Sequence, residues 1–390
     1  MRIMHISTRL ILGGSQENTV LSCAGQADDG HAVSLVFGPI EGPEGTMLPT
    51  VEAHGGIEAI ETPNLVREIA PRRDWRCRRE LEALIRDWRP DVVHTHSSKA
   101  GILGRAAAWH AEVPAVVHTI HGLPFHPYQS ALKNAAYIRA ERWAARRCHA
   151  IATVADAMRD QALAVGIGRP EQYRTVRSGM LVEPYLDDAE SMHGARARLG
   201  LPQDAFIVGT VARLAELKGH DDLLDALGEA MRDDPGIHLL WVGDGWWSER
   251  LLGRVRELGL ADRVHTPGLV APETIPGWIK AMDVVAHPSY REGLPRAVVQ
   301  GLLSARPVVT YALDGAPEVC IDGETGFLVA PGDRAGLRDA VLRLRHDADR
   351  GAALGRAGRD RCRTAFDHRT MVRDLENLYR RVLDRREVGP

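Results

Sequence analysis

The stretch DVVAHPSYREGLPRAVVQ, residues 283–300, joins a short apolar run to a Gly/Pro turn and then to helical sequence. A strand followed by a turn and a helix is the repeating unit of parallel α/β folds, which bind ligands at the carboxyl ends of their strands. The turn carries a carboxylate, Glu292, and the helix carries an amide, Gln300. We expect Glu292 to accept hydrogen bonds from ligand hydroxyls while the helix N-terminus faces a phosphate. The plainer alternatives are a helix-dipole partner for Glu292 and an exposed helix position for Gln300.

Apolar runs of this kind recur along the whole chain of 390 residues. They are rich in β-branched residues and alternate with amphipathic stretches, which is typical of a parallel sheet covered by helices on both faces. The pattern stops and restarts once, which predicts two doubly wound Rossmann-like α/β domains. The predicted strands cover residues 2–7, 31–37, 91–96, 115–121, 150–155, 205–212, 238–245, 263–268, 283–289, 307–313 and 326–330.

The join between the two domains is expected in residues 178–192, where Gly, Pro and acidic residues interrupt the periodicity. We place the N-terminal domain at residues 1–183 and the C-terminal domain at residues 184–367. Residues 368–386 have apolar side chains at spacings of three and four, which predicts a final amphipathic helix. Because ligands bind at strand C-termini in doubly wound folds, we expect the site in a cleft between the domains.

Composition narrows the class of protein. Hydrophobic residues make up 44% and charged residues 26%, and the formal net charge of -3 argues against a nucleic-acid-binding protein. The five cysteines are scattered without a CxxC pair, which favours free thiols in a reducing compartment. No apolar stretch approaches the roughly 18 residues of a membrane span, and the N-terminus does not resemble a signal peptide. We expect a cytoplasmic protein.

Two loops after strands carry groups suited to phosphate. Arg213 and Lys218 follow the first strand of the second domain, where a guanidinium and an ammonium could hold a diphosphate. Gly13 and Gly14 follow the first strand of the chain and would let the backbone approach a ligand, with Ser15 expected to cap the next helix. Each loop alone fits a solvated loop or an ordinary turn about equally well, and the chain has no GxGxxG.

Taken together, seven segments resemble glycosyltransferase family 4, the retaining enzymes of GT-B fold. They occur in the family's order over nearly the whole chain: GGSQE (13–17), HTHSSKAGILGR (94–105), HTIHG (118–122), VARLAELKG (211–219), VGDG (242–245), HPSYREGLPRAVVQ (287–300) and GAPEVCIDGETGFLV (315–329). The resemblance implies an acceptor-binding N-terminal domain, a C-terminal domain that binds a nucleotide-sugar donor, and a last helix (368–388) that returns to the N-terminal domain. It also implies transfer to a hydroxyl acceptor in surface glycan or glycolipid assembly.

The resemblance also implies roles for single residues. Arg213 and Lys218 would stabilise the leaving diphosphate, Glu292 would bind donor-sugar hydroxyls, and His121 would lie beside the sugar. The implied donor contacts are Gly14, Gly209, Gly243, Val270, Gly293, Leu294 and Gln300, and the implied acceptor-side residues are Gly13, His96 and Lys99. The chain departs from the family at Gln300, where a glutamate usually binds the ribose, and at Gln16, where the family often has glutamate. Because an amide can still bind a hydroxyl, we expect weaker donor binding rather than lost chemistry.

No carboxylate in the sequence is a convincing nucleophile for a covalent glycosyl-enzyme, so we expect the front-face mechanism usual for the family. A metal is not expected. His94 and His96 share one strand face, but no acidic ligand is placed with them. Asp347 and Asp349 imitate the DxD motif of the other glycosyltransferase fold but lie in an Arg-rich segment that is expected to be a solvated loop.

Residues 131–150 carry five basic residues against one acid, Glu141. This segment could contact an anionic membrane or a lipid-linked pyrophosphate, or it could be a charged solvent face. We expect a nucleotide-sugar donor, with UDP favoured over GDP, and a glycan or lipid-linked acceptor. The alternatives are a nucleotide-sugar 2-epimerase of the same fold and a nucleotide-sugar-binding protein with weak catalysis or none.

Overall fold

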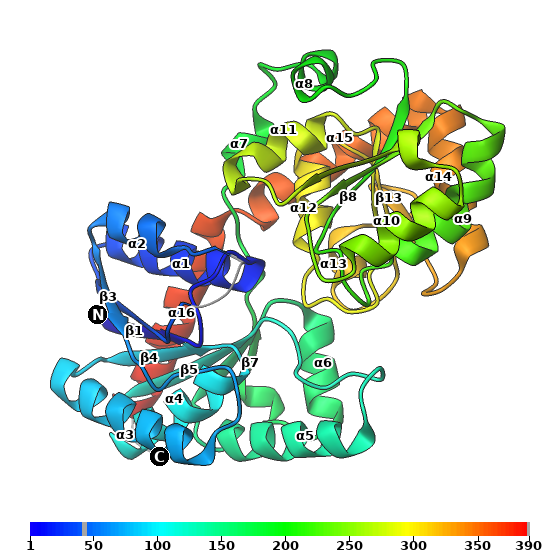
Figure 1. Ribbon diagram of the computed structural model, residues 1–390. Coiled ribbons are helices and arrows are strands. Elements are labelled where there is room, and N and C mark those ends of the chain that lie inside the picture. Colours follow the sequence, from blue (N-terminus) through cyan, green and yellow to red (C-terminus); the bar gives the residue numbers. More distant parts are fainter. Residues whose placement is uncertain (41–44, 388–390) are drawn as a thin grey trace. The chain divides into compact units, whose positions relative to one another are not determined.

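The computed structural model describes residues 1–40 and 45–387 (Figure 1). The chain divides into two compact units: unit 1 is Met1–Met180 with Phe366–Pro390, and unit 2 is Leu181–Ala365. The boundaries expected from the sequence were 183/184 and 367/368, within three residues of this division. Both units are built on parallel sheets, as the apolar runs predicted.

Unit 1 contains a seven-stranded sheet in the order β3-β2-β1-β4-β5-β6-β7, and all of its neighbouring strands are parallel. Its central strands are buried along almost their whole length, which is why they appear in the sequence as continuous apolar runs. The strands are β1 (Arg2–Ser7), β2 (Ala32–Phe37), β3 (Ile57–Glu61), β4 (Val92–His96), β5 (Ala115–Ile120), β6 (Ala150–Thr153) and β7 (Tyr173–Thr175).

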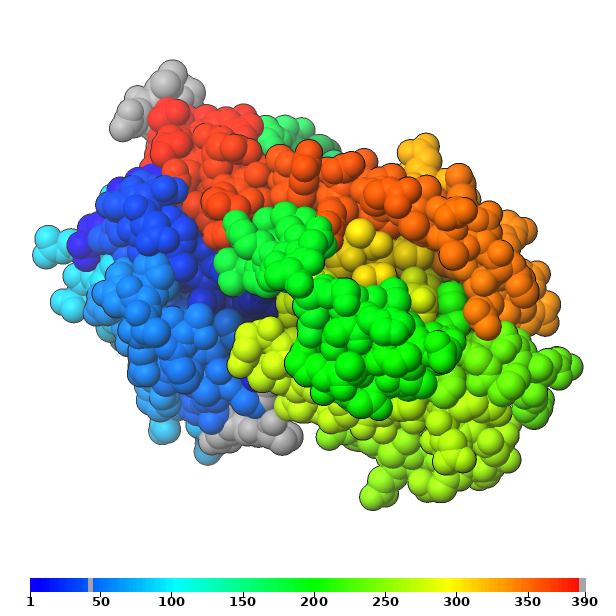
Figure 2. Space-filling model, turned by 90° about the horizontal axis from the view of Figure 1, so that it is seen from above, coloured from blue at the N-terminus to red at the C-terminus, as the bar shows by residue number. Residues whose placement is uncertain are grey.

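The helices of unit 1 include one from the far end of the chain. They are α1 (Gly14–Asp28), α2 (Leu48–His54), α3 (Pro71–Trp88), α4 (Ser98–His110), α5 (Ala131–Ala145), α6 (Asp156–Ala164), the 3-10 turn Pro170–Gln172 and α16 (His368–Glu387). Helix α16 packs beside α1, and Figure 2 shows the red C-terminal segment against the blue N-terminal one. Met371, Leu375 and Leu378 bury its apolar face in a core that includes Ile3 of β1.

Unit 2 contains a six-stranded parallel sheet in the order β10-β9-β8-β11-β12-β13. The strands are β8 (Phe206–Val211), β9 (Ile237–Val242), β10 (Val264–Gly268), β11 (Val284–His287), β12 (Val308–Tyr311) and β13 (Gly326–Val329). The helices are α7 (Glu183–Leu186), α8 (Met192–Leu199), α9 (His220–Asp233), α10 (Ser248–Glu257), α11 (Ile275–Lys280), α12 (Arg296–Leu303), α13 (Ala316–Val319), α14 (Arg334–His346) and α15 (Ala348–Ala365), with 3-10 turns at Ala261–Arg263 and Pro272–Thr274.

Each sheet has one point at which the strand order reverses. In unit 1 the chain moves outward from β1 on one side and from β4 on the other, and in unit 2 it does so from β8 and β11. Loops that leave neighbouring strands in opposite directions open a crevice at the strand C-termini, where ligands bind in such sheets. The predicted site residues 13–14 follow β1, His96 ends β4 and Lys99 follows it, and those around 213–218 and 292–294 follow β8 and β11.

Two strands of unit 1 were not predicted. The edge strand β3 has the sequence IEAIE, and only Ile57 of its five residues is buried. Strand β7 is only three residues long and is also at an edge. Strand β3 is mostly exposed and β7 is too short, so both lack the apolar run by which a buried strand is recognised. None of the described helices is long and apolar enough to span a bilayer.

Candidate active site

The loop after β8 and the loop after β11 are bonded to each other at the reversal point of unit 2. The Leu217 carbonyl accepts hydrogen bonds from the Tyr290 amide at 2.8 Å and from the Ser289 hydroxyl at 3.1 Å. Leu217 has a φ of 63°, a left-handed conformation that costs energy for a residue with a side chain. Two residues later, a Cβ on Gly219 would lie 2.0 Å from the Pro288 carbonyl oxygen, so only glycine fits there. These contacts hold the two loops, and the site residues on them, in fixed positions.

Glu292 is the centre of this loop pair. Its Oε1 accepts hydrogen bonds from Lys218 Nζ at 2.6 Å and from His287 Nε2 at 2.9 Å. The backbone amide of Glu292 donates to Asp314 Oδ2 at 2.8 Å, and this bond holds the loop after β11 against the loop after β12. The structure therefore brings together Lys218 and Glu292, which the sequence predicted separately. It adds His287 and Asp314, which were missed because a histidine ending an apolar strand and an acid in a loop carry no distinctive spacing.

The carboxylate keeps its charge in this environment. Burial alone would raise the pKa of Glu292, but the Lys218 ammonium and the hydrogen bond from His287 outweigh it and hold that pKa well below its ordinary value. Both donors bind Oε1, and none of the described residues donates to Oε2. The site thus presents an ionised oxygen that can accept a hydrogen bond from a ligand hydroxyl.

Backbone donors lie beside this oxygen. Within the described ranges, no residue accepts a hydrogen bond from the amides of Gly293 and Leu294, while the Gly293 carbonyl accepts from Gly315 N at 3.1 Å. These amides precede Pro295, which is the N-cap of α12. Free amides at a helix N-terminus bind phosphate oxygens well. The local geometry therefore supports the predicted placement of an anion next to Glu292.

Arg213 lies in the same loop as Lys218 and is exposed. Its guanidinium lies over the ring of Trp246, with 5.5 Å between Cζ and the ring centroid. Two other predicted donor contacts follow β9 and β10, the next strands of the sheet. Gly243 has a φ of 140° just after β9, and a Cβ there would lie 2.2 Å from the Ala212 carbonyl oxygen. Val270 is half-buried in the segment after β10.

The amide of Gln300 has a partner. Its Nε2 donates to the Tyr185 hydroxyl of α7 at 2.8 Å, and both side chains are at least partly buried. Gln300 is therefore not an exposed helix position. The bond orients the side chain amide, so its oxygen points along a fixed direction.

Gly209 does not occupy the position expected of a donor contact. It lies inside β8, not at the C-terminal end of that strand, and the space of its Cβ is filled by Met282, whose sulfur would be 1.9 Å away. We assign it a packing role, and the predicted donor contact is withdrawn. A glycine in a strand interior often marks a close approach of this kind.

In unit 1 the predicted Gly-Gly turn forms the start of α1. Gly13 is the N-cap and Gly14 the first residue of the helix. The expected cap by Ser15 is wrong, because its hydroxyl donates instead to Gln16 Oε1 at 2.8 Å and no side chain caps this helix. A Cβ on Gly13 would lie 2.8 Å from the same Gln16 oxygen. The uncapped N-terminus leaves backbone donors at the end of β1, where an anion is favoured.

Next to this turn, the chain is strained at the end of β4. Ser97 has a φ of 61° and a ψ of 162°, a conformation that is almost confined to glycine, and its hydroxyl is 2.6 Å from that of Thr8. Backbone strain of this kind is concentrated at functional sites. Lys99, predicted on the acceptor side, is mostly buried and forms an ion pair with Asp74 of α3. Its charge is therefore already neutralised within unit 1.

The structure brings His96 and His121 together, with 3.0 Å between His96 Nδ1 and His121 Nε2, although separate roles were expected for them. His121 is half-buried just after β5, while His96 is buried in β4. His5 of β1 and His94 of β4 lie against His96, and the three could geometrically hold a metal ion. Every ring nitrogen of these three residues already has a hydrogen-bond partner within unit 1. Burial lowers the pKa of His5 to about 4 and also lowers those of His94 and His96.

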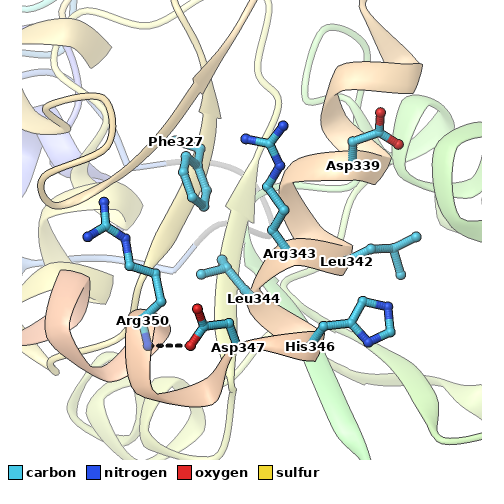
Figure 3. A pocket seen from close by; sticks show the side chains of 8 residues that line it. All are labelled: Phe327, Asp339, Leu342, Arg343, Leu344, His346, Asp347 and Arg350. Carbon is cyan, nitrogen blue, oxygen red and sulfur yellow. Dashed lines mark hydrogen bonds between the residues drawn. The ribbon is translucent and has the colours of Figure 1, made fainter.

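The acidic pair in the Arg-rich segment has a structural role. Asp347 lies between α14 and α15, and its Oδ1 accepts a hydrogen bond at 2.9 Å from the Arg350 amide in the first turn of α15 (Figure 3). Asp349 is inside α15, so the expected loop is a helix–helix junction. A hollow of about 770 Å³ beside it is lined by Phe327, Arg343 and Arg350 and contains no residue of the predicted site.

Comparison with known proteins agrees with this geometry. Residues 13–179 match the glycosyl transferase 4-like domain, and residues 205–347 match the glycosyl transferases group 1 family. The chain is 30% identical to the 2-deoxystreptamine glucosyltransferase of Streptomyces kanamyceticus, with 72% of this chain and 75% of that protein covered. It is 27% identical to an Escherichia coli UDP-Gal:alpha-D-GlcNAc-diphosphoundecaprenol alpha-1,3-galactosyltransferase, with 75% and 76% covered.

Among solved structures, Anabaena HepE in complex with UDP-glucose superimposes with a TM-score of 0.82 at 22% identity, covering 97% of this chain and 99% of that one. This likeness confirms the GT-B class of α/β fold. The family matches cover both units, and they agree with the motifs recognised in the sequence. The chain belongs to the family 4 type of glycosyltransferases of GT-B fold.

Proposed function

We propose that this glycosyltransferase moves a sugar from a UDP-sugar to a hydroxyl of a glycan or lipid-linked glycan, with retention of anomeric configuration. The observation that carries the proposal is the Lys218–Glu292–His287 cluster at the reversal point of unit 2. It offers an ionised acceptor oxygen beside backbone amides, the combination needed to hold a sugar hydroxyl next to a phosphate. The HepE complex contains UDP-glucose, and the Escherichia coli relative is named for a UDP-sugar.

In the proposed reaction the bond between the anomeric carbon and the diphosphate oxygen breaks, and a bond from the acceptor oxygen forms on the same face. The acceptor proton passes to the leaving phosphate oxygen. Arg213 and Lys218 would stabilise the charge that develops on this oxygen, and Glu292 would orient the sugar ring. No residue of the cluster is proposed as a nucleophile, because Glu292, the carboxylate of the cluster, is assigned to binding the sugar hydroxyls.

The donor is tested by thermal unfolding with UDP, GDP, UDP-glucose, UDP-galactose, UDP-N-acetylglucosamine and GDP-mannose. A bound donor stabilises the folded state by mass action and therefore raises the melting temperature. At a donor concentration 100 times Kd, the free energy of unfolding increases by about 2.7 kcal/mol. UDP and one UDP-sugar should shift it, and GDP should not. A shift by GDP compounds alone would replace the UDP assignment.

Retention is tested by NMR of the product, whose anomeric proton coupling must match that of the donor sugar. The same spectra without acceptor test for a 2-epimerase, which would change the donor sugar by itself. An inverted product, or epimerisation without acceptor, contradicts the proposal. Nucleotide binding without turnover on any acceptor would favour the binding-protein alternative.

We also propose that the reaction needs no metal ion. The nitrogens of His5, His94 and His96 are engaged in hydrogen bonds, and Asp347 caps a helix. Activity should persist in EDTA. Activity that disappears with EDTA and returns with a divalent cation would contradict this.

The acceptor side is proposed to rest on an anionic membrane through α5. The one acid of this segment, Glu141, is buried in an ion pair with Arg105 at 2.6 Å, which leaves the exposed surface cationic. Leu132 and Trp143 are 83% and 42% exposed among these charges. Basic residues with exposed apolar side chains suit a membrane surface. The exposed basic residues are Lys133, Arg139, Arg142 and Arg146.

Flotation with liposomes tests this contact. The protein should float with vesicles that contain anionic lipid and stay unbound with neutral vesicles. The double variant Arg139→Glu and Arg146→Glu should abolish flotation, while Arg76→Glu, at an exposed site on α3, should not. Equal flotation of both variants, or binding independent of lipid charge, would remove the membrane proposal.

A further inference from the structure

A chain of buried side chains in unit 1 leads from α1 to His121. Gln26 Oε1 lies 2.8 Å from His5 Nε2, His5 Nδ1 lies 2.9 Å from His96 Nε2, and His96 Nδ1 lies 3.0 Å from His121 Nε2. Gln26, His5 and His96 are at most 1% exposed. Neither Gln26 nor His5 was among the residues predicted for the site, and the same is true of Tyr379 of α16, which contacts Gln26.

The hydrogen bonds along such a chain of neutral imidazoles all run from donor to acceptor in the same direction. A neutral imidazole has one N–H group and one lone pair, so a ring that accepts at one nitrogen must donate from the other. Burial lowers the pKa of His5 to about 4 and lowers that of His96 as well, so both rings are neutral near pH 7. The orientation of the first member therefore fixes the proton on every ring that follows.

The direction is decided at Tyr379. Its hydroxyl lies 2.5 Å from His94 Nδ1, which is at the short end of the range for an O–H donor and below the range for an N–H donor. Tyr379 therefore donates its only proton to His94 and must accept from Gln26 Nε2, which is 3.3 Å away. This leaves Gln26 Oε1 facing His5 as an acceptor. His94 in turn donates from Nε2 to the Thr119 hydroxyl at 2.7 Å, so each contact of the network has one donor and one acceptor.

We propose that Gln26 is a positioning residue that, through His5 and His96, holds His121 in the tautomer with its proton on Nε2. Each ring of the chain then donates from Nε2 toward Gln26. In this tautomer His121 Nδ1 carries the lone pair of the ring and can only accept hydrogen bonds. In an enzyme of the proposed function, this nitrogen would accept from a sugar hydroxyl, and that part of the inference rests on the proposed function.

The tautomer is measured by two-bond ¹H–¹⁵N NMR of selectively ¹⁵N-histidine-labelled protein without donor or acceptor. The result therefore does not depend on activity. The His121 signal is assigned from the spectrum of His121→Gln. The wild type should show His121 protonated at Nε2, and Gln26→Met, which removes both hydrogen-bonding groups at similar volume, should give mixed tautomers. Ser22→Ala, a buried position on the same helix outside the chain, should keep the wild-type pattern.

Tyr379→Phe provides a second route to the same result, because it removes the hydroxyl that orients the Gln26 amide. It should also mix the His121 tautomers. In a turnover assay, kcat/KM of Gln26→Met should fall by about 2- to 10-fold, the value of one neutral hydrogen bond. An Nδ1-protonated His121 in the wild type, or an unchanged single tautomer in both variants, would overturn the proposal.

Discussion

Lys218 and Glu292 act on each other before any ligand binds. The 2.6 Å ion pair stabilises the carboxylate, and it also reduces the charge that Lys218 can offer to a diphosphate. Arg213, which has no acidic partner among the described residues, keeps its full charge over the ring of Trp246. The two cations of this loop are therefore not equivalent. Arg213 is the cleaner test of charge stabilisation because its loss leaves no carboxylate unpaired.

We expect Arg213→Ala to lower kcat by about 10²-fold or more, the scale of removing one preorganised electrostatic group. The melting temperature should stay within error, since the exposed guanidinium contributes little to the fold. Steady-state kinetics with a saturating donor measure the effect. Glu216→Ala, an exposed residue in the same loop, is the matched control and should keep normal turnover. Near-normal rates in both Arg213→Ala and Lys218→Ala would refute the assigned roles.

Gln300→Glu should lower the donor KM while kcat changes little. The Tyr185 hydroxyl, which now accepts from the amide, can rotate and donate to the new carboxylate. A charged acceptor binds a ribose hydroxyl more strongly than an amide does, by about a factor of two in hydrogen-bond strength. Glu292→Gln should instead lower kcat. If the two variants exchange these effects, the roles of the two positions are reversed.

At this scale the sequence predicted some groups and missed others for physical reasons. Lys218 and Glu292 were identified because they are charged residues in turns after predicted strands and lie in segments that resemble the family's motifs. Gln26 and Tyr379 were not, because they lie on helices at opposite ends of the chain and only the fold brings them to His5 and His94. Lys99 was predicted to face the acceptor, but its pairing with Asp74 depends on a contact between α3 and α4 that spacing does not reveal.

At the level of elements, the loops after β8 and β11 are joined by backbone hydrogen bonds and by the Lys218–Glu292 ion pair. The pKa of Glu292 is lower in the folded state than in the unfolded chain. The unfolded state therefore binds more protons as the pH falls below about 4.3, and the stability gained from Glu292 is lost in that range. Above that pH the contribution is fully present.

Glu292→Gln removes this titration, so the variant should lose less stability than the wild type when the pH is lowered from 6 to 3. Hydrogen exchange of the 283–303 segment, followed by mass spectrometry at both pH values, measures it. Glu216→Gln, exposed in the neighbouring loop, should behave as the wild type. An identical pH dependence in Glu292→Gln and wild type would show that the ion pair does not stabilise these loops.

Element prediction succeeded where burial dominated the sequence. All eleven predicted strands are present. Most of them are apolar runs because strands covered on both faces need continuous apolar residues, whereas the edge strand β10 is only partly buried. Strands β3 and β7 are held by pairing with a neighbour at a sheet edge, so their own residues need not be apolar. Helix α16 was predicted correctly from its periodicity, since its apolar face is buried while the opposite face is exposed.

At the scale of the whole molecule, the last helix contributes to the unit that contains the first strand. We expect Leu375→Ala, which truncates a side chain that is 3% exposed, to destabilise unit 1 by about 2–5 kcal/mol. Hydrogen exchange resolved by unit should show faster exchange in residues 1–180 and unchanged exchange in residues 181–365. Asn377→Ala, exposed on the same helix, is the control. Equal destabilisation of both units would mean that they do not unfold separately.

The two-part composition of unit 1 also has a consequence for synthesis on the ribosome. Domains usually fold in the order in which they emerge, with the N-terminal one first. Here the first 180 residues leave the exit tunnel without the helix that covers Ile3 and Val92, and about 185 further residues must be translated before that helix appears. Unit 2 is contiguous and can complete its fold in the meantime. The N-terminal sheet is therefore completed after unit 2, although it is synthesised before it.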